Sequence, residues 1–258
     1  MVFRAAERWR PPSLENSRSK VGQLVGAARR FLDLQAGSIY RDVAAELAEP
    51  HGVVLDVGCG GQPLRHLVPS ADRYIGIDIA EARDWFGYEV PDTIYYRGDT
   101  WPVEDASVDL VLCTEALEHV KEPGKFLAEA ARVTRPGGTI LLTVPFAARW
   151  HFIPHDYWRF TPSSIRSLLE ENGFTDIEVY ARGNHVTVAC YKGMALILPL
   201  LLSAGDSRLG AVARRLAGLM LSPALLPLAA VANLSLRGSG GDDCLGYTAV
   251  AKRKSDPA

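Results

Sequence analysis

The sequence lacks the cysteine spacing of a zinc site or a disulfide framework. Its four cysteines are scattered over 258 residues without a CxxC pair. Three of them stand in apolar, strand-like runs, which is typical of buried free thiols in a reducing compartment. The first twenty residues also lack the apolar core of a signal peptide. We therefore expect a cytoplasmic protein with no metal site and no disulfides.

A strong charge of either sign is absent as well. The 28 lysines and arginines nearly balance the 30 aspartates and glutamates, and the net charge is -2. This balance gives no general reason to expect a nucleic acid as a partner. Hydrophobic residues make up 48% of the chain, which is ample for a buried core.

The most informative segment runs from Val53 to Pro63, VVLDVGCGGQP. Its apolar start is short and rich in β-branched residues, which predicts a buried parallel strand. The glycines that follow allow a tight turn against a ligand. This turn lacks both the GxGxxG spacing of a dinucleotide-binding loop and any basic residue. Because Asp56 stands at the end of the strand, the turn suits a cationic or amine-bearing ligand better than a pyrophosphate.

Strand-like runs recur after this segment, and helical patterns separate several of them. Such alternation predicts right-handed β–α–β units and a parallel sheet. The clearest helix runs from Pro123 to Thr134, and Thr161 and Pro162 begin another that continues to Glu171. The predicted strands are residues 53–57, 74–79, 93–99, 108–113, 139–146, 175–181 and 246–253. We expect an α/β fold with a doubly wound, seven-stranded, mostly parallel sheet whose last strand is antiparallel.

Composition divides the chain further. The cap before the first strand is expected to hold two helices, Val21–Leu34 and Ile39–Ala48, with Ser38 as the N-cap of the second. The expected segments are a flexible polar arm (1–20), an N-terminal helical cap (21–50), the core (51–182), an apolar helical insert before the last strand (183–243), and the last strand with its tail (244–258).

The apolar insert admits three interpretations. Leu216–Leu236 contains no charged residue and is long enough to span a bilayer. Pro223 and Pro227 inside it argue against a straight span. The other interpretations are a buried helical hairpin, and a lid or peripheral membrane contact through residues 193–237. Arginines flank the apolar pieces as interfacial anchors would, which favours the membrane contact.

Acidic residues or turns stand at the ends of four successive predicted strands. Open α/β sheets bind their ligands at this edge. Any one of these acids alone is a weak signal, since such acids are often solvated caps, but the series at this spacing is strong. The residues are Asp56, Asp78, Asp99 with Thr100 beside it, and Glu115.

With these positions, the chain resembles the class I S-adenosylmethionine-dependent methyltransferases. The resemblance covers about Val53 to Val179 and rests on the blocks LDVGCG, SVDLV, LEHV and RPGG, which are typical of the small-molecule group of that family. It implies a Rossmann-like methyltransferase fold and S-adenosylmethionine as the cofactor. The sulfonium and ammonium groups of that cofactor agree with an acidic turn that is free of lysine and arginine.

The resemblance also implies roles for individual residues. Asp56, Gly58 and Gly60 would line the methionine end of the cofactor, and Asp78, with Ile79 beside it, would bind the ribose. Asp99 and Thr100 would contact the adenine, and Glu115 begins the stretch that closes over the cofactor. The family's usual third glycine is Gln62 here, which makes Gln62 a candidate contact and predicts a different path after Gly61. We expect His119 of the LEHV block to orient the loop, and Gly137 and Gly138 to have a structural role.

A second group of functional residues lies in Arg149–Thr161, RWHFIPHDYWRFT, directly after the predicted strand 139–146. Histidines and aromatics this dense are costly to bury without purpose. His155, next to Asp156, is the first candidate for a general base, and His151 is the second. The alternative is that Asp156 and Arg159 form an ion pair that holds the loop. A metal site of His151, His155 and Asp156 matches no specific pattern.

The expected function is methyl transfer from S-adenosylmethionine to a small-molecule, lipid-linked or glycan-type acceptor, at oxygen. The alternatives are methyl transfer to carbon or nitrogen of a small metabolite, and a catalytically silent module that binds the cofactor. A nicotinamide-dependent oxidoreductase is disfavoured, because the GxGxxG loop is missing. The CTEALEH stretch also lacks the Asn/Asp-Pro-Pro-aromatic element of enzymes that methylate nucleic-acid amines, and we expect no nucleic-acid substrate. The sequence leaves the oligomeric state open.

Overall fold

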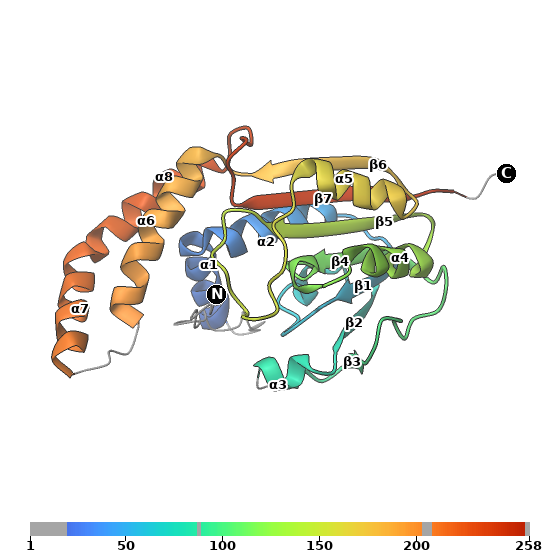
Figure 1. The fold of residues 1–258 in the computed structure, drawn as a ribbon, viewed down its shortest axis with the longest axis horizontal. Coiled ribbons are helices and arrows are strands. Elements are labelled where there is room, and N and C mark those ends of the chain that lie inside the picture. Colours follow the sequence, from blue (N-terminus) through green and yellow to red (C-terminus); the bar gives the residue numbers. More distant parts are fainter. Residues whose placement is uncertain (1–19, 87–88, 203–207, 256–258) are drawn as a thin grey trace, which may run out of the picture.

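The computed structural model describes residues 20–86, 89–202 and 208–255 (Figure 1). The expected polar arm therefore lies almost wholly outside the described residues. One seven-stranded sheet has the order β3-β2-β1-β4-β5-β7-β6, in which β7 alone runs antiparallel to its neighbours. The strands are β1 (Val53–Val57), β2 (Arg73–Ile79), β3 (Thr93–Tyr96), β4 (Val108–Thr114), β5 (Thr134–Pro145), β6 (Phe174–Arg182) and β7 (Gly246–Arg253). The predicted doubly wound, mostly parallel α/β sheet is confirmed.

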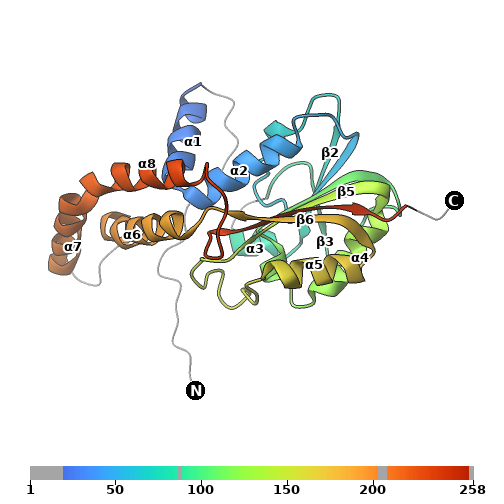
Figure 2. The same ribbon diagram turned by 90° about the horizontal axis from the view of Figure 1, so that it is seen from above.

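Helices cover both faces of this sheet (Figure 2). The first half of the chain contributes α1 (Lys20–Leu32), α2 (Leu34–Glu46), α3 (Ala82–Phe86) and the short 3₁₀ helices η1 (Arg65–Leu67) and η2 (Leu117–His119). The second half contributes α4 (Pro123–Val133), α5 (Pro162–Glu171), α6 (His185–Leu202), α7 (Arg208–Leu221), η3 (Ser222–Ala224) and α8 (Leu225–Ser235).

The apolar residues of the strands alternate between two cores, as the period of a strand requires. Leu55 and Val57 of β1 face the larger core, which also contains Leu127 of α4 and Leu169 of α5. Val54 of the same strand faces the smaller core with the buried residues of α2. Because β1 is buried on both faces, its sequence is a nearly continuous apolar run and does not alternate with polar residues.

The boundaries of three predicted elements are wrong. The strand predicted over residues 93–99 is β3 and ends at Tyr96, so Asp99 lies in the segment after it. The second cap helix begins at Leu34, because Asp33 is its N-cap and accepts a hydrogen bond from the backbone N–H of Ala36. The predicted N-cap, Ser38, instead lies inside α2 and donates its hydroxyl to the carbonyl of Gln35. Strand β5 begins at Thr134, before the glycines, because its pairing with β4 shifts register there.

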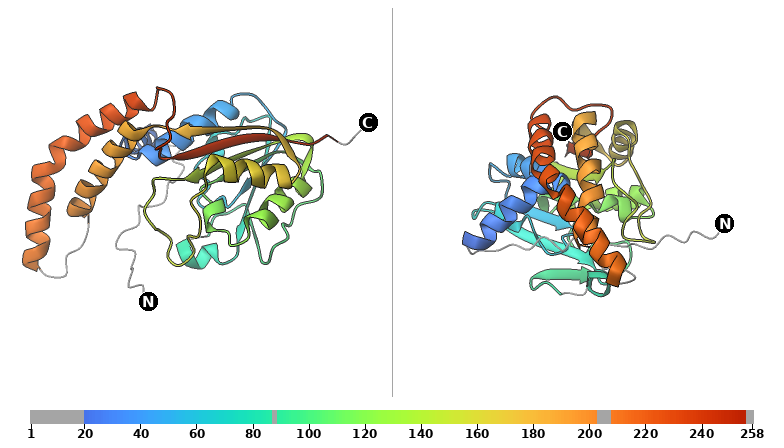
Figure 3. Two further views of the ribbon diagram at one scale, coloured as in Figure 1. Left: turned by 45° about the horizontal axis from the view of Figure 1, so that its top comes forward. Right: turned by 90° about the vertical axis from the view of Figure 1, so that its left-hand side faces the viewer.

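The apolar insert forms an arm of three helices that extends beyond one end of the sheet (Figures 1 and 3). Helices α6 and α8 pack together around Met194, Ala229 and Ala232, beside Leu34 of the cap. The outer face is exposed, and only 17% of the most apolar window in Gly210–Ser235 is buried. The interpretation as a buried hairpin is therefore wrong for α7 and the outer side of α8. By length and composition alone, Gly210–Ser235 could cross a membrane, which is weak evidence for a span.

Candidate functional site

Asp78 at the end of β2 organises the glycine turn at the carboxyl edge of the sheet. Its two carboxylate oxygens accept hydrogen bonds from the backbone N–H groups of Gly60, at 2.9 Å, and Ile79, at 2.8 Å. Gly58 has a φ of 69°, and a Cβ there would lie 2.8 Å from the Cβ of Ala116. Only glycine combines this conformation with so close an approach. The fold thus brings the turns after β1, β2 and β4 together, as the spacing of the motifs predicts.

Asp56 is a buried acid in this turn region. Its Oδ2 accepts a hydrogen bond from the Tyr74 hydroxyl at 2.7 Å, and its Oδ1 has no hydrogen-bond partner among the residues described. Burial raises the pKa of Asp56 to about 7, and the nearby Asp78 adds to the rise. Burial also raises the pKa of Asp78, against its two backbone hydrogen bonds. A positive charge bound beside these two buried acids would lower the pKa of both.

Gln62 takes the place of the expected third glycine by adopting the glycine conformation, with a φ of 52°. Its side chain is buried, donates to the Thr93 hydroxyl at 2.8 Å and accepts from Arg65 at 2.9 Å. The chain then continues into the single turn of η1. The side-chain amide therefore serves the protein's own packing, and a ligand contact by Gln62 stays a prediction.

Asp99 and Thr100 lie at the exposed rim of the site. The side chain of Asp99 is 77% exposed, and its carboxylate lies 3.8 Å from the ammonium of Lys125. Such an exposed pair contributes little to stability, so the geometry leaves Asp99 available to a ligand. Its predicted contact with adenine stays a prediction.

Glu115 follows β4 with a φ of 49° and is paired with a fully buried arginine. Arg182, at the end of β6, donates to the Glu115 carboxylate at 2.7 Å and to the Val144 carbonyl at 3.1 Å. A Cβ on Gly246 would lie 2.3 Å from this guanidinium, so glycine is required there. The sequence analysis did not identify Arg182 as a partner of Glu115. The only indication in the sequence is a cation at the end of the strand predicted over residues 175–181.

The loop of residues 146–161 is fastened to η2 by three hydrogen bonds. The backbone N–H of Tyr157 donates to the Glu118 carbonyl at 2.9 Å, and the indole of Trp158 donates to the Val120 carbonyl at 2.9 Å. The third bond joins His119 Nδ1 to the His155 carbonyl at 2.7 Å. His119 thus orients the loop, as the sequence predicted. These bonds fix the loop beside η2, which follows β4 in the chain.

Asp156 holds this loop from inside. Its buried carboxylate accepts two hydrogen bonds from Arg159, at 2.6 and 2.8 Å, and one from the His151 backbone N–H at 3.0 Å. Burial opposes ionisation, but these hydrogen bonds prevail and lower the pKa of Asp156. The ion pair that was the alternative in the sequence is therefore present. Asp156 also lies 3.1 Å from His151 Nδ1, whereas His155 Nδ1 lies 3.4 Å from the Tyr157 hydroxyl.

Part of the chain is similar in sequence to known methyltransferases. The family described as "Methyltransferase domain" matches residues 55–142. A ubiquinone biosynthesis O-methyltransferase of Hahella chejuensis is 36% identical over 105 residues, which are 37% of this chain and 44% of that protein. Its counterpart in Maricaulis maris is 30% identical over 151 residues, 47% of this chain and 58% of that protein. The chain thus spans about half the length of these relatives.

Solved structures share the fold. A putative sarcosine dimethylglycine methyltransferase of Galdieria sulphuraria has a TM-score of 0.51 at 19% identity, covering 96% of this chain and 93% of its own. The [4+2]-cyclase SpnF also has a TM-score of 0.51 at 19% identity, over 86% and 83% of the two chains. At such low identity these structures support the fold alone. Residues 55–142 thus match a methyltransferase domain, and this match supports S-adenosylmethionine as the cofactor.

Proposed function

We propose that the chain transfers the methyl group of S-adenosylmethionine to a hydroxyl oxygen of a small acceptor that has a ring and an apolar tail. The observation that supports this proposal is the loop of residues 146–161, which carries two histidines and several aromatic rings and is hydrogen-bonded to the segment that follows β4. Trp150, Tyr157 and Trp158 are each about two-fifths exposed and offer faces for a ring to stack on. The ubiquinone-pathway names of the two relatives agree with an oxygen acceptor of this kind.

The residues present fit the cofactor. Asp56 offers a buried carboxylate oxygen that lacks a partner in the described chain, and Gly58 and Gly60 leave room for close approach. In this proposal Asp56 and the turn hold the charged methionine end, and Asp78 accepts from the ribose hydroxyls. Asp99 contacts the adenine at the exposed rim.

Bound S-adenosylmethionine supplies an electrophilic methyl group on a positively charged sulfur. His155 takes the proton of the acceptor hydroxyl, and His151, supported by Asp156, is the second candidate for this role. Transfer would form the bond between acceptor oxygen and methyl carbon as the carbon–sulfur bond breaks, leaving that electron pair on sulfur and the proton on the histidine. The protein's further contribution is alignment, because transfer needs the acceptor in line with that bond.

Purified chain with methyl-labelled S-adenosylmethionine tests the proposal. We expect label in a methyl ether when the acceptor is an alkylated catechol, and none with matched aniline or amine acceptors. His155→Ala should lower kcat by about 100-fold or more, as is typical for loss of a general base. His66→Ala, on an exposed histidine stacked on Tyr40, is the matched control and should leave kcat unchanged.

Two results would contradict this assignment. Label in an amine or on carbon would show a different acceptor. Tight binding of S-adenosylhomocysteine with no labelled product from a broad extract would favour a silent module or another reaction on this fold, of which the cyclase SpnF is an example.

The exposed apolar face of the helical arm is the reason that the proposed acceptor has an apolar tail. Its exposed side chains include Leu216, Leu219 and Met220, which are between 57% and 82% exposed. Over the whole insert, residues 183–243, the sequence has five lysines and arginines and three acids, Asp206, Asp242 and Asp243. An apolar face with an excess of cations is complementary to the surface of an anionic bilayer. The arm would then hold the chain where an apolar-tailed acceptor resides.

Vesicle flotation tests this membrane contact. We expect the full chain to float with phosphatidylglycerol vesicles more than with phosphatidylcholine vesicles, and less so at high salt, because the cations contribute. Replacing Leu216, Leu219 and Met220 by Gln should reduce flotation at least about tenfold, since each buried side chain contributes about 1.5–3 kcal/mol. Ile94→Gln, on an exposed residue of β3, is the matched control.

Equal flotation of the triple variant and the wild type would remove the membrane role. Resistance to alkaline extraction would indicate a span, and concentration-dependent dimers without vesicle binding would assign the face to a second copy of the chain.

A further inference from the structure

Glu118 in η2 is a fully buried acid that the proposed methyl transfer does not use. Neither of its carboxylate oxygens has a hydrogen-bond partner within the described part of the chain, although the side chain is 0% exposed. A buried carboxylate without hydrogen bonds is costly, and native structures normally provide each such group with a donor or a cation. The orphaned oxygens of Glu118 therefore require a partner.

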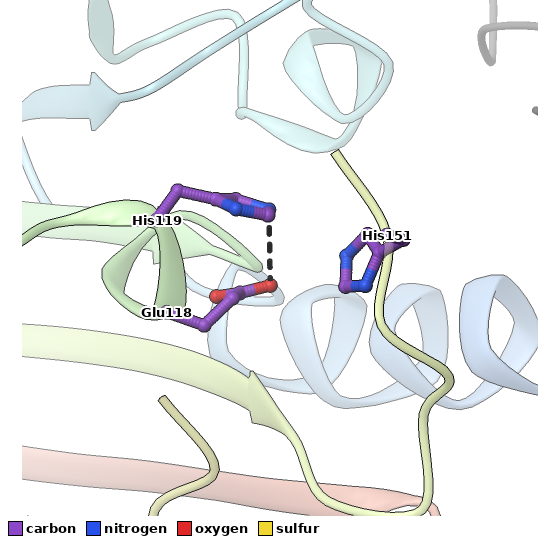
Figure 4. Close-up of side chains that lie close together, drawn as sticks. All are labelled: Glu118, His119 and His151. Atoms are coloured by element: carbon purple, nitrogen blue, oxygen red, sulfur yellow. Dashed lines mark ion pairs between the residues drawn. The ribbon is translucent and has the colours of Figure 1, made fainter. Parts of the chain in front are cut away.

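Two histidine rings face this carboxylate (Figure 4). His119 Nε2 lies 3.6 Å from Glu118 Oε1, and His151 stands on the loop that runs beside η2. One ligand atom from each of the three residues lies within 4.8 Å of the other two. The groups come from two segments that are more than thirty residues apart, and the fold alone brings them together.

Hydrogen bonds fix the tautomers of both rings. His119 Nδ1 contacts the His155 carbonyl at 2.7 Å, and His151 Nδ1 contacts the Arg149 carbonyl at 3.0 Å. A carbonyl only accepts, so each Nδ1 carries the hydrogen and each Nε2 presents a lone pair. Metal-binding histidines are oriented in this way, with the second ring nitrogen donating to a carbonyl or carboxylate. Asp156, which lies 3.1 Å from His151 Nδ1, adds a carboxylate to this outer layer.

We propose that Glu118, His119 and His151 bind a divalent transition-metal ion of the zinc or iron type. Two imidazoles and one carboxylate are the protein ligands of catalytic zinc sites and of iron sites that keep open positions. Ligands of one tetrahedral ion lie about 3.3 Å apart at ordinary bond lengths, so a bound ion would draw these ligand atoms, now within 4.8 Å of one another, closer together. The ion fastens this loop to η2 and leaves a coordination position for an oxygen ligand.

The binding site stands independently of the methyl transfer proposed above. Arg159, whose charge acts on Glu118 and His119, is neutralised by its paired hydrogen bonds with Asp156. An acceptor hydroxyl bound at the open position would approach the methyl group from the side of the aromatic loop; this role rests on the proposed function, whereas metal binding does not.

Cobalt substitution tests the site. The full chain, treated with chelator and dialysed, should bind one Co²⁺ with the strong visible absorption of a low-coordinate ion, and one Zn²⁺ should displace it. Glu118→Gln and His151→Ala should each weaken Zn²⁺ binding in calorimetry at least 100-fold. His155→Ala is the matched control, because it removes a histidine of the same loop and retains the carbonyl that holds His119.

Thermal melts establish that each variant is folded before it is compared. Absence of a 1:1 Co²⁺ complex in the wild type would overturn the proposal. Binding that survives Glu118→Gln and His151→Ala but is lost in His155→Ala would overturn it too, because the ion would then lie elsewhere. Methyl-transfer activity is not needed for any of these outcomes.

Discussion

Asp78→Ala should weaken the binding of S-adenosylhomocysteine by about 100- to 1000-fold. Hydrogen bonds to a charged group contribute about 1.5–3 kcal/mol each, and the proposed ribose contact has two of them. The same carboxylate also positions the glycine turn through the N–H groups of Gly60 and Ile79, so its loss loosens the cradle as well. Calorimetry at pH 7.5, with NAD as a second ligand, measures the effect.

Asp99→Ala is the matched comparison, because Asp99 is an acid at the same edge but 77% exposed. A solvated contact contributes less to binding, so we expect the affinity of Asp99→Ala for S-adenosylhomocysteine to fall only about tenfold. Burial raises the pKa of Asp78, and its carboxyl therefore takes up a proton at a higher pH than an exposed aspartate does. Affinity in the wild type should fall as the pH is lowered through that raised pKa. Unchanged affinity in Asp78→Ala, or tight NAD binding, would contradict our placement of the cofactor.

Glu115→Gln should lower the free energy of unfolding by about 3–5 kcal/mol, the range found when one member of a buried ion pair is removed. The change leaves Arg182 fully buried without its counter-charge. The reverse change, Arg182→Met, should cost less, because Glu115 is 26% exposed and water can solvate it. Urea denaturation of both variants measures this asymmetry.

The double variant Glu115→Gln with Arg182→Met completes a thermodynamic cycle. Because the two side chains touch, its loss should be smaller than the sum of the single losses. Strictly additive losses would show that the pair contributes nothing beyond its separate contacts. Gly246→Ala provides a comparison for the free energy of unfolding, because its added Cβ would clash with the guanidinium of Arg182.

The sheet could be predicted because its signals are local. The runs at β1, β4 and β7 are short, apolar and bounded by glycines or acids, and Thr161 with Pro162 marks the start of α5. The acids at the strand ends were found in the same way, since parallel strands place their carboxyl ends at one edge. The start of α2 was missed because Asp33 and Ser38 are both good N-caps, and tertiary packing decided between them.

The site above the sheet could not be predicted to the same depth. His155 and Asp156 are neighbours in sequence, but the loop turns the carboxylate toward Arg159 and His151. The grouping of Glu118, His119 and His151 depends on how the loop folds back over η2, which no spacing in the sequence encodes. The exposure of the helical arm could not be predicted either, because apolar helices have the same sequence pattern whether protein, lipid or nothing covers them.

The central place of β7 has a consequence for the order of assembly. This strand pairs with β5 on one side and β6 on the other, and it follows the helical arm in the chain. Until β7 has been synthesised, the edges of β5 and β6 that pair with it remain open. The apolar arm precedes β7 in the chain and is synthesised first. Such late, long-range pairing slows folding and leaves unpaired strand edges that favour aggregation. A nascent chain would therefore benefit from a chaperone until β7 has paired with both neighbours.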